Sequence, residues 1–361
     1  LVRAISVASR TVAQKSTIPA LEGIYIRAGV KLTLSGYNLE TGITISVDAE
    51  IQQTGACIMP SRLFFDIIRK LPGDTVSISV DEKFKVSIRG GISSFSITAM
   101  SSEDYPELPE VESDKGISLP QNELKAMIGG TSFAVSENQA RPIHTGCLFE
   151  VEDSSITVVA VDGYRLALRR WKSEEPIGRT LKFVVPAAAL KEAEKILGDT
   201  DEACTFFLGS KHILFTIGEA TLVCRLLEGE FLDWRRVLPQ NQPVKLAVNV
   251  AKMTDSIERV GLIISEKLKS PVRCKFGENT ADFRSVSTIG EAHDVCQIAG
   301  DGQDMEIGFN CRYLLDALRA IPDAECSLEL INGLSPIVMN PCDGSERYSY
   351  MVLPVRLKAG E

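Results

Sequence analysis

The sequence predicts an α+β fold in three tandem, topologically similar domains, and two observations support this prediction. The first is a segment that occurs three times, as MPSRLFFDIIRKLPGD from Met59, VVPAAALKEAEKILGD from Val184 and GFNCRYLLDALRAIPD from Gly308. Pro60, Pro186 and Asn310 occupy equivalent places, so the copies are 126 and 124 residues apart. The second is that alternating, β-branched segments follow each copy, as antiparallel strands require. Repetition at a fixed period indicates one structural unit used three times.

Each unit is predicted to contain two helices, each followed by strands. The repeated segments predict helices over 60–70, 186–197 and 310–320, because a Pro or Asn precedes apolar residues at three-to-four spacing. Upstream of each copy lies another amphipathic segment, about 1–13, 121–135 and 250–265. Strands are expected next, as in GIYIRAGVKLTLSGYNLETGITISV and GCLFEVEDSSITVVAVDGYRLALRRW.

The predicted domain boundaries lie in two proline-containing stretches typical of linkers, the acidic SSEDYPELPEVESDKG and the mixed-charge GEFLDWRRVLPQNQP. They divide the chain into domains at 1–115, 116–242 and 243–361. Tandem duplication by itself is also compatible with a simple stack of modules.

The composition is that of a folded globular protein. Apolar residues make up 44% and charged residues 24% of the 361 residues. No run of about 18 apolar residues is present, and the first residues alternate apolar with polar, so we expect a cytoplasmic protein without a membrane segment. The nine cysteines are odd in number and scattered among apolar residues, which predicts reduced, buried thiols.

Catalytic and metal-binding motifs are missing, and we therefore expect no catalytic residue, no metal and no cofactor. The sequence has three histidines and only isolated ligand pairs such as His293 and Cys296, and it has no CxxC, GxSxG, GxxxxGK[ST] or HExxH motif. The best enzymatic alternative is Asp162, Tyr164 and Arg165 as acid, base and anion clamp. The favoured interpretation is a turn at Asp162-Gly163 between two apolar strands, with Arg165 paired to a surface carboxylate.

The formal net charge of -9 argues against a nucleic-acid partner, but the charge is unevenly distributed. Segments 1–13, 60–70, 121–136, 186–197, 250–265 and 310–320 carry 12 Lys and Arg against 7 Asp and Glu, a net of +5, which leaves -14 for the rest. If these helices face a common partner, they would attract a polyanion without binding it tightly. Charged helices are often simply solvated, so this asymmetry only permits nucleic-acid binding.

The chain resembles the β subunit of bacterial DNA polymerase III, the sliding clamp family, over nearly its whole length. The matching motifs, in order, are MPSRLFFDIIRKLP, RPIHTGCLFE, VDGYRLA, GEFLDWRRVLP, FNCRYLLDAL and LPVRL. The resemblance implies the DNA-clamp fold, with two chains joined head to tail in a ring, helices lining the hole and antiparallel sheets outside. It implies a non-catalytic processivity factor that encircles double-stranded DNA regardless of sequence. Relative to the family, the chain starts inside the first helix, without the first short strand, and carries KAGE after the usual terminal RL.

The resemblance also implies a hydrophobic cleft between the second and third domains. In the family this cleft binds short peptides of the polymerase III α subunit, the clamp loader, other polymerases and repair proteins. The matching positions are His144, Val161, Gly163, Tyr164, Arg165, Leu166, Leu232, Arg236, Val237, Asn310, Tyr313, Pro336, Met351, Leu353, Pro354, Val355 and Arg356. His144 stands where the family usually has an apolar residue such as leucine, and Leu232 replaces a proline. These two departures are expected to alter which peptides bind.

Two further sets of residues follow from the resemblance. Lys15, after the first helix, and Asn138 and Arg141, after the third, are expected to contact DNA phosphate or sugar without reading bases. Tyr105 and Leu108 are expected to meet Leu262 and Ile263 of the partner subunit, in a heterologous contact that closes after two copies. The alternative from another class of protein is a monomeric peptide-binding adaptor that does not encircle DNA, and the assembly state would distinguish the two.

Overall fold

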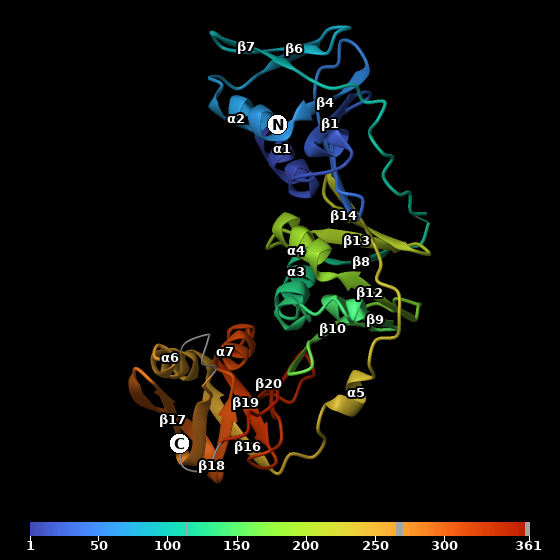
Figure 1. Ribbon diagram of the computed structural model, residues 1–361. Helices are drawn as coiled ribbons and strands as arrows, with labels where there is room; N and C mark the ends of the chain where they lie inside the picture. The colour runs from blue at the N-terminus through green and yellow to red at the C-terminus, as the bar shows by residue number, and fades with distance from the viewer. Residues whose placement is uncertain (113, 265–269, 358–361) are drawn as a thin grey trace. The chain divides into compact units, whose positions relative to one another are not determined.

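The computed structural model describes residues 1–112, 114–264 and 270–357, and these form two compact units (Figure 1). The first unit is Leu1–Lys125 with Ala188–Leu226, and the second is Ala126–Ala187 with Leu227–Glu361. Three sequence predictions touch positions outside the described residues: Ser113 in the first linker, Ser265 at the end of a helix, and the KAGE segment 358–361.

The first unit contains an eight-stranded antiparallel sheet that combines two of the sequence repeats. Its strands are β1 (Gly23–Ala28), β2 (Leu32–Tyr37), β3 (Thr41–Val47), β4 (Gly55–Pro60), β8 (Ile117–Pro120), β13 (Ala203–Leu208), β14 (His212–Ile217) and β15 (Ala220–Arg225). They lie in the order β4-β1-β2-β3-β15-β14-β13-β8. The β3–β15 pair, with Ile43 opposite Leu222, joins the first repeat to the second. A separate three-stranded sheet contains β5 (Ser77–Val80), β6 (Lys85–Gly90) and β7 (Ser93–Thr98).

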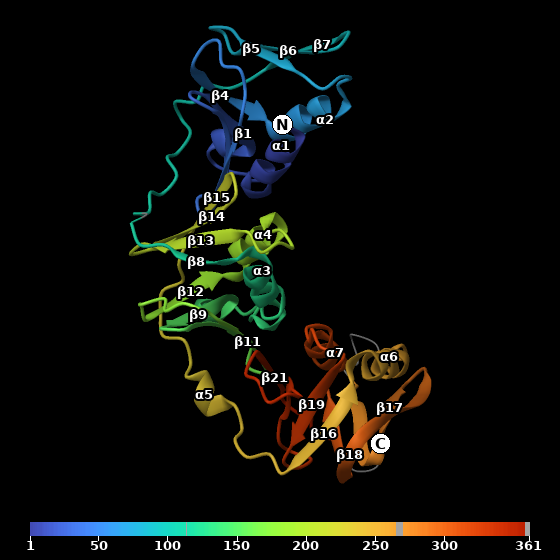
Figure 2. The same cartoon turned by 180° about the vertical axis from the view of Figure 1, so that it is seen from behind.

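Helices α1 (Val2–Ala8) and α2 (Ser61–Lys70) lie side by side in this unit (Figures 1 and 2). The stripe Phe64, Ile67 and Ile68 of α2 is buried, which confirms that helix prediction. The first predicted helix continues after α1 as a 3-10 turn over Ser9–Thr11, and the prediction is wrong for its last two residues. The backbone becomes extended at Val12. The preceding residue is Thr11, whose Oγ1 donates a 2.8 Å hydrogen bond to the carbonyl of Gly36. A tertiary contact therefore ends this helix.

The second unit contains a ten-stranded antiparallel sheet. Its strands are β9 (Gly146–Glu152), β10 (Ser155–Val161), β11 (Arg165–Lys172), β12 (Leu181–Pro186), β16 (Val244–Asn249), β17 (Val272–Ser287), β18 (Gly290–Phe309), β19 (Glu325–Leu330), β20 (Ile337–Pro341) and β21 (Tyr348–Val352). Their order is β12-β9-β10-β11-β21-β20-β19-β16-β18-β17. The β11–β21 pair, with Leu166 opposite Met351, joins the second repeat to the third.

Helices α6 (Val250–Gly261) and α7 (Cys311–Arg319) lie side by side in the second unit in both views (Figures 1 and 2). Asn249 and Asn310 cap them, because their side chains accept hydrogen bonds from the backbone amides of Lys252 and Tyr313. The prediction over 310–320 is confirmed, whereas the helix predicted over about 250–265 is shorter than expected, because α6 ends at Gly261 and a turn follows. The predicted linker 229–243 contains a short helix, α5 (Trp234–Val237), which the sequence analysis did not anticipate.

The remaining two helices, α3 (Gln121–Gly129) and α4 (Ala187–Ile196), confirm the last helix predictions. The third predicted helix is shorter than expected, because α3 ends at Gly129 and a 3-10 turn, η3 (Ser132–Ala134), follows. The division between the two compact units falls within α3 and α4, so strands of the second repeat occur in both units. The boundaries 1–115, 116–242 and 243–361 stay a prediction.

The cysteine prediction is confirmed for seven of the nine thiols, which are buried and form no disulfide bond. Burial raises the pKa of the Cys224 thiol to about 12, so this group stays protonated and unreactive at neutral pH. The prediction is wrong for Cys342, which is exposed just after β20, and only partly correct for Cys311. Within the described ranges, no helix combines the length and the apolar character needed to cross a bilayer.

Candidate functional site

A buried apolar cluster lies where the strands of the second and third repeats meet in the ten-stranded sheet. On β10 and β11, Val161 opposes Leu166 and Val159 opposes Leu168. The cluster consists of Leu148, Val159, Val161, Leu166, Leu168, Val184, Phe231, Trp234, Val338 and Met351, with Ile143, Leu227, Leu232, Leu238 and Leu353 packed against it. It therefore brings together five of the residues predicted for the cleft, namely Val161, Leu166, Leu232, Met351 and Leu353.

The predicted turn between β10 and β11 is confirmed, and its geometry accounts for its residues. Asp162 Oδ1 accepts hydrogen bonds from the backbone amides of Tyr164 at 2.9 Å and Arg165 at 3.1 Å. Gly163 has a φ of +91°, in the left-handed region that glycine adopts without strain. The turn leaves Tyr164 61% exposed, with its ring stacked at 6.0 Å on that of Tyr313 from α7. An aromatic pair is thus displayed beside the apolar cluster.

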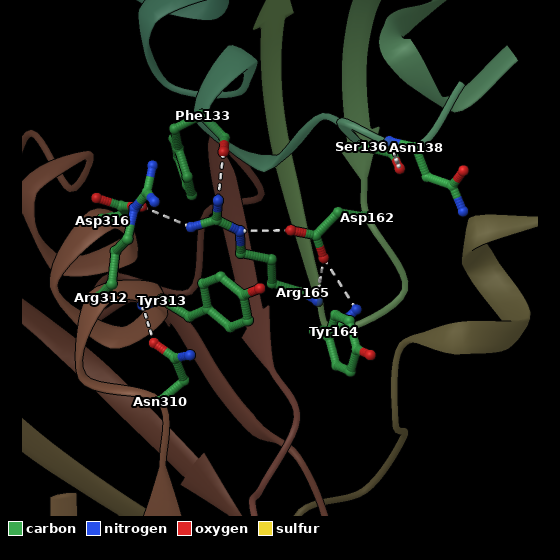
Figure 3. A network of polar contacts seen from close by, with 10 residues as sticks. All are labelled: Phe133, Ser136, Asn138, Asp162, Tyr164, Arg165, Asn310, Arg312, Tyr313 and Asp316. Atoms are coloured by element: carbon green, nitrogen blue, oxygen red, sulfur yellow. Dashed lines mark hydrogen bonds and ion pairs between the residues drawn. The ribbon is translucent and has the colours of Figure 1, made fainter. Parts of the chain in front are cut away.

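Arg165 is the centre of a polar network that joins three segments of the second unit (Figure 3). Its Nε donates to Asp162 at 2.9 Å, one terminal nitrogen donates to Asp316 of α7 at 2.7 Å, and the other donates to the carbonyl of Phe133 at 2.6 Å. The guanidinium also lies over the Phe133 ring at 5.3 Å and the Tyr313 ring at 4.4 Å. Arg165 is a buried cation, and each of its three guanidinium nitrogens donates a hydrogen bond.

The expectation that Arg165 pairs with a carboxylate at the surface is therefore wrong, since only 7% of this residue is exposed. Its guanidinium pairs with two carboxylates and a carbonyl inside the unit. Asp162 is also committed, because its carboxylate accepts from two backbone amides and from Arg165. Neither side chain is left available for acid–base chemistry. The hydrogen bonds of Arg165 instead connect three segments of the second unit, which is a structural role.

Helix α5 is held on β9 by contacts that the sequence analysis missed. Trp234 is buried, and its indole nitrogen donates to Glu150 Oε2 at 3.0 Å. Arg235 donates to the same oxygen at 2.8 Å and lies over the Trp234 ring, while Lys182 is 3.2 Å from the other carboxylate oxygen. The signal in the sequence was a tryptophan inside a supposed linker, because such a large apolar residue is rarely left in solvent.

Lowering the pH should weaken the attachment of α5 to β9. Burial opposes ionisation of Glu150, but the hydrogen bonds from Trp234, Arg235 and Lys182 outweigh it and hold the pKa of Glu150 below its ordinary value of 4.5. As the pH falls, the Glu150 carboxylate is protonated in the unfolded chain before it is protonated in the folded one. Its contribution to the free energy of unfolding is therefore fully present above about pH 5 and is lost as the pH falls through the lowered pKa. We expect Glu150→Gln to flatten the acid branch of stability against pH, measured from urea midpoints between pH 7 and 3. An unchanged slope would contradict this role.

A hollow of about 350 Å³ opens beside the apolar cluster, lined by Arg141, Ile143, His144, Glu230, Phe231, Leu232 and Asp233. The His144 ring meets the Phe231 ring edge-on, with centroids 5.2 Å apart. Burial, and then the charge of Arg141, lower the pKa of His144. Ile143 and Phe231 were not among the predicted residues, although each directly adjoins one of them in the sequence.

The other residues predicted for the cleft lie on α5, after β21 and before β20, and they differ in exposure. Arg236 and Val237 are exposed on α5, where Arg236 pairs with Asp233 at 3.0 Å. The segment after β21 is held by its backbone, since the amide of Leu353 donates to the carbonyl of Tyr164 at 2.8 Å and that of Val355 to Gly308 at 2.7 Å. Pro354 lies between these two bonds and Arg356 follows as an exposed residue, while Pro336 directly precedes β20.

The residues predicted to contact DNA lie on loops. Lys15 lines a hollow of about 640 Å³ in the first unit, together with residues 12–14, Ser16, Asn38 and Glu40. Asn138 and Arg141 are exposed in the loop between η3 and η4 (Pro142–Thr145) of the second unit. Asn138 shapes this loop, because its side chain accepts from the amide of Ala140 at 2.9 Å and its carbonyl accepts from that of Arg141 at 3.2 Å.

Of the residues predicted for the dimer interface, two pack within their own unit and two are exposed or partly exposed. Tyr105 packs within its own unit, stacked at 5.0 Å on Tyr25, with its hydroxyl 3.4 Å from the carbonyl of Ser35. Leu108 packs against Gly42 of β3 so closely that a Cβ on that glycine would lie 2.7 Å from the leucine side chain. Leu262, directly after α6, is 81% exposed, and Ile263 is partly exposed.

Metal ligation finds no support among residues 1–112, 114–264 and 270–357, where no three His, Cys, Asp or Glu side chains are grouped suitably. His293 lies 2.6 Å from Asp282 in an exposed pair. The Cys296 sulfur instead donates to the carbonyl of Gln297 at 3.4 Å.

Comparisons with known proteins agree along the whole chain. Models of the DNA polymerase III beta subunit match residues 1–109 (N-terminal domain), 118–233 (central domain) and 235–356 (C-terminal domain). The beta sliding clamp of Staphylococcus epidermidis is 33% identical over 363 residues, covering 96% of this chain and 94% of that protein. Crystal structures of the beta subunit from Eubacterium rectale and the sliding clamp from Bacillus subtilis superpose with a TM-score of 0.93 each. Their sequences are 31% and 30% identical to this one, respectively. The superpositions cover 98% and 99% of this chain, and 96% and 97% of the two crystallised chains.

These matches confirm the three-domain clamp fold, and they identify a non-catalytic role in place of the enzymatic alternative at Asp162 and Arg165. The chain belongs to the DNA polymerase III beta subunit family, the DNA sliding clamps of bacteria.

Proposed function

We propose that two copies of this chain close head to tail into a ring around double-stranded DNA in the cytoplasm, and that the ring tethers partner proteins through the site in the second unit. The observation that carries the ring is edge-to-edge strand pairing between successive repeats. It occurs at β3–β15 and again at β11–β21. A third pairing of the same kind, between the third repeat of one chain and the first repeat of another, would extend this pattern to closure.

The strands that such a pairing would use have free edges in the described part of the chain. β7 ends its sheet and pairs with β6 alone, and residues 290–295 of β18 pair with β17 alone. Each edge carries exposed apolar side chains, including Phe95 on β7 and Val295 on β18. Free edges of this kind readily pair with another chain. Leu262 and Ile263, which follow α6, would add apolar contacts with Tyr105 and Leu108 of the partner subunit.

The DNA contacts we propose are sequence-independent. Lys15, Asn138 and Arg141 are polar groups on loops, suited to phosphate and sugar contacts that can be made and broken as the ring slides. The overall charge of -9 keeps such binding weak away from the basic helices.

The partner site we propose binds short, extended peptides of the polymerase III α subunit, the clamp loader, other polymerases and repair proteins. The apolar cluster and the hollow beside it supply surface to bury, and the Tyr164–Tyr313 pair supplies an aromatic wall. Arg165 and Asn310 hold the turn and the start of α7 in place around it. One shared site would make these partners compete.

Light scattering coupled to size exclusion tests assembly first. A ring predicts a mass of twice 39.4 kDa at micromolar concentration, whereas a monomeric adaptor would have 39.4 kDa. The second measurement is retention on DNA after loading by a clamp loader. We expect the protein to stay on a closed circle and to leave once the circle is cut, because closure holds the ring in place and local contacts are weak. Equal retention on circular and linear DNA would contradict encirclement.

A further inference from the structure

We propose that His144 is the specificity-determining residue of the hollow lined by residues 141, 143, 144 and 230–233, and that it selects a peptide side chain with an apolar body and a neutral hydrogen-bonding end. This inference rests on the proposed peptide-binding function and names the chemistry of the side chain that this site takes.

Three of the seven residues that line the hollow are apolar, and the His144 ring packs directly against one of them, Phe231. Ile143 and Leu232 pack against the buried cluster, and Phe231 belongs to it. The His144 ring is packed edge-on against Phe231. Its backbone is fixed on both sides, since its amide donates to the carbonyl of Arg141 at 3.1 Å and its carbonyl accepts from Ser136 at 2.8 Å. The imidazole is therefore held at the hollow rather than free to swing away.

The ring nitrogens of His144 have no hydrogen-bond partner among the side chains and backbone of the described residues, although the ring contributes to the lining. Neither nitrogen is among the buried unpaired atoms in the described part of the chain, so both are accessible to solvent while the hollow is open. A bound side chain would displace that solvent, and an all-hydrocarbon side chain would leave a ring nitrogen unpaired. A site with a polar group discriminates strongly against ligands that cannot pair with it. The hollow should thus favour an anchor with a hydroxyl or amide end over its hydrocarbon counterpart.

The charges around the hollow indicate that this end is neutral. Burial and Arg141 lower the pKa of His144, so at pH 7 the ring is neutral and offers one donor and one acceptor. The charged groups that line the hollow with it are Arg141, Glu230 and Asp233, and Asp233 pairs with Arg236 from α5. With Asp233 paired to Arg236, the charges of Arg141 and Glu230 offset each other, so the lining has no excess charge that would attract an acidic or a basic anchor. A hydroxyl or amide can match both the donor and the acceptor of the neutral ring.

The test compares N-acetyl-tyrosinamide with N-acetyl-phenylalaninamide, which differ by a single hydroxyl. Because the chain has only three histidines, the His144 imidazole resonances can be assigned by their loss in His144→Leu, and each ligand can be titrated against them in the whole protein. In the variant, aromatic resonances of Phe231 and Tyr164 report binding. We expect the unsubstituted protein to bind the tyrosine compound about tenfold more tightly, the order expected for one buried polar group left unpaired. His144→Leu should bind both compounds equally.

The matched control is His212→Leu, since His212 lies on β14 in the first unit and its pKa is also lowered, first by burial. This variant should keep the tenfold preference. Equal binding of the two compounds by the unsubstituted protein, an unchanged ratio in His144→Leu, or no response of His144 to either compound would each overturn the proposal. Retention on circular DNA tests the proposed clamp function separately, because retention does not depend on which anchor the hollow prefers. A protein that is retained but shows no preference would therefore overturn only the proposal about His144.

Discussion

Replacing Arg165 with alanine is expected to lower the free energy of unfolding of the second unit by about 3 kcal/mol and to abolish peptide binding. The substitution leaves Asp162 and Asp316 without their shared cation, and both carboxylates are largely shielded from water. It also frees the carbonyl of Phe133 and removes the group packed between the Phe133 and Tyr313 rings. The turn after β10, η3 and α7 would then lose their common contact.

Tryptophan fluorescence during urea unfolding measures this effect selectively, because the only two tryptophans, Trp171 and Trp234, both belong to the second unit. The matched control is Arg312→Ala. Arg312 lies 3.9 Å from Asp316 but its side chain is 70% exposed, so its removal should change stability by less than about 0.5 kcal/mol. If both variants behaved alike, the structural role of Arg165 would be refuted.

Replacing Trp234 with alanine should cost about 3–5 kcal/mol, since it removes a large side chain from the apolar cluster and a donor from Glu150. Helix α5 would lose its buried contact with β9 and keep only the ion pairs of Arg235, and the neighbouring Phe231 and Leu232 would be held less firmly at the hollow. We therefore expect peptide binding to be lost while retention on circular DNA persists. Fluorescence of the remaining Trp171 would follow the unfolding.

The conservative variant Trp234→Phe separates packing from hydrogen bonding. It keeps most of the apolar contact and removes only the indole donor, so we expect a loss of about 1–2 kcal/mol, and partial peptide binding. A cost below about 1 kcal/mol for Trp234→Ala would show that α5 does not depend on this anchor.

The candidate site was predictable where its chemistry lies in a contiguous motif. The VDGYRLA segment indicated a turn at Asp162-Gly163, and the structure has that turn with glycine in the left-handed region. The buried state of Arg165 was not predictable, because its partners Phe133 and Asp316 lie 32 and 151 residues away along the chain. Trp234 and Glu150, 84 residues apart, were missed for the same reason.

The three repeats and the location of six helices could be predicted from the amino-acid sequence, because apolar periodicity and capping residues are encoded within a few turns of chain. The pairing of strands from successive repeats, as β3 pairs with β15 and β11 with β21, is seen only in the folded chain. The tertiary structure also decided that Thr11 ends the first helix and that a supposed linker folds into α5. Strand partners and burial depend on contacts between distant segments, and alternation along one strand does not specify which edge it meets.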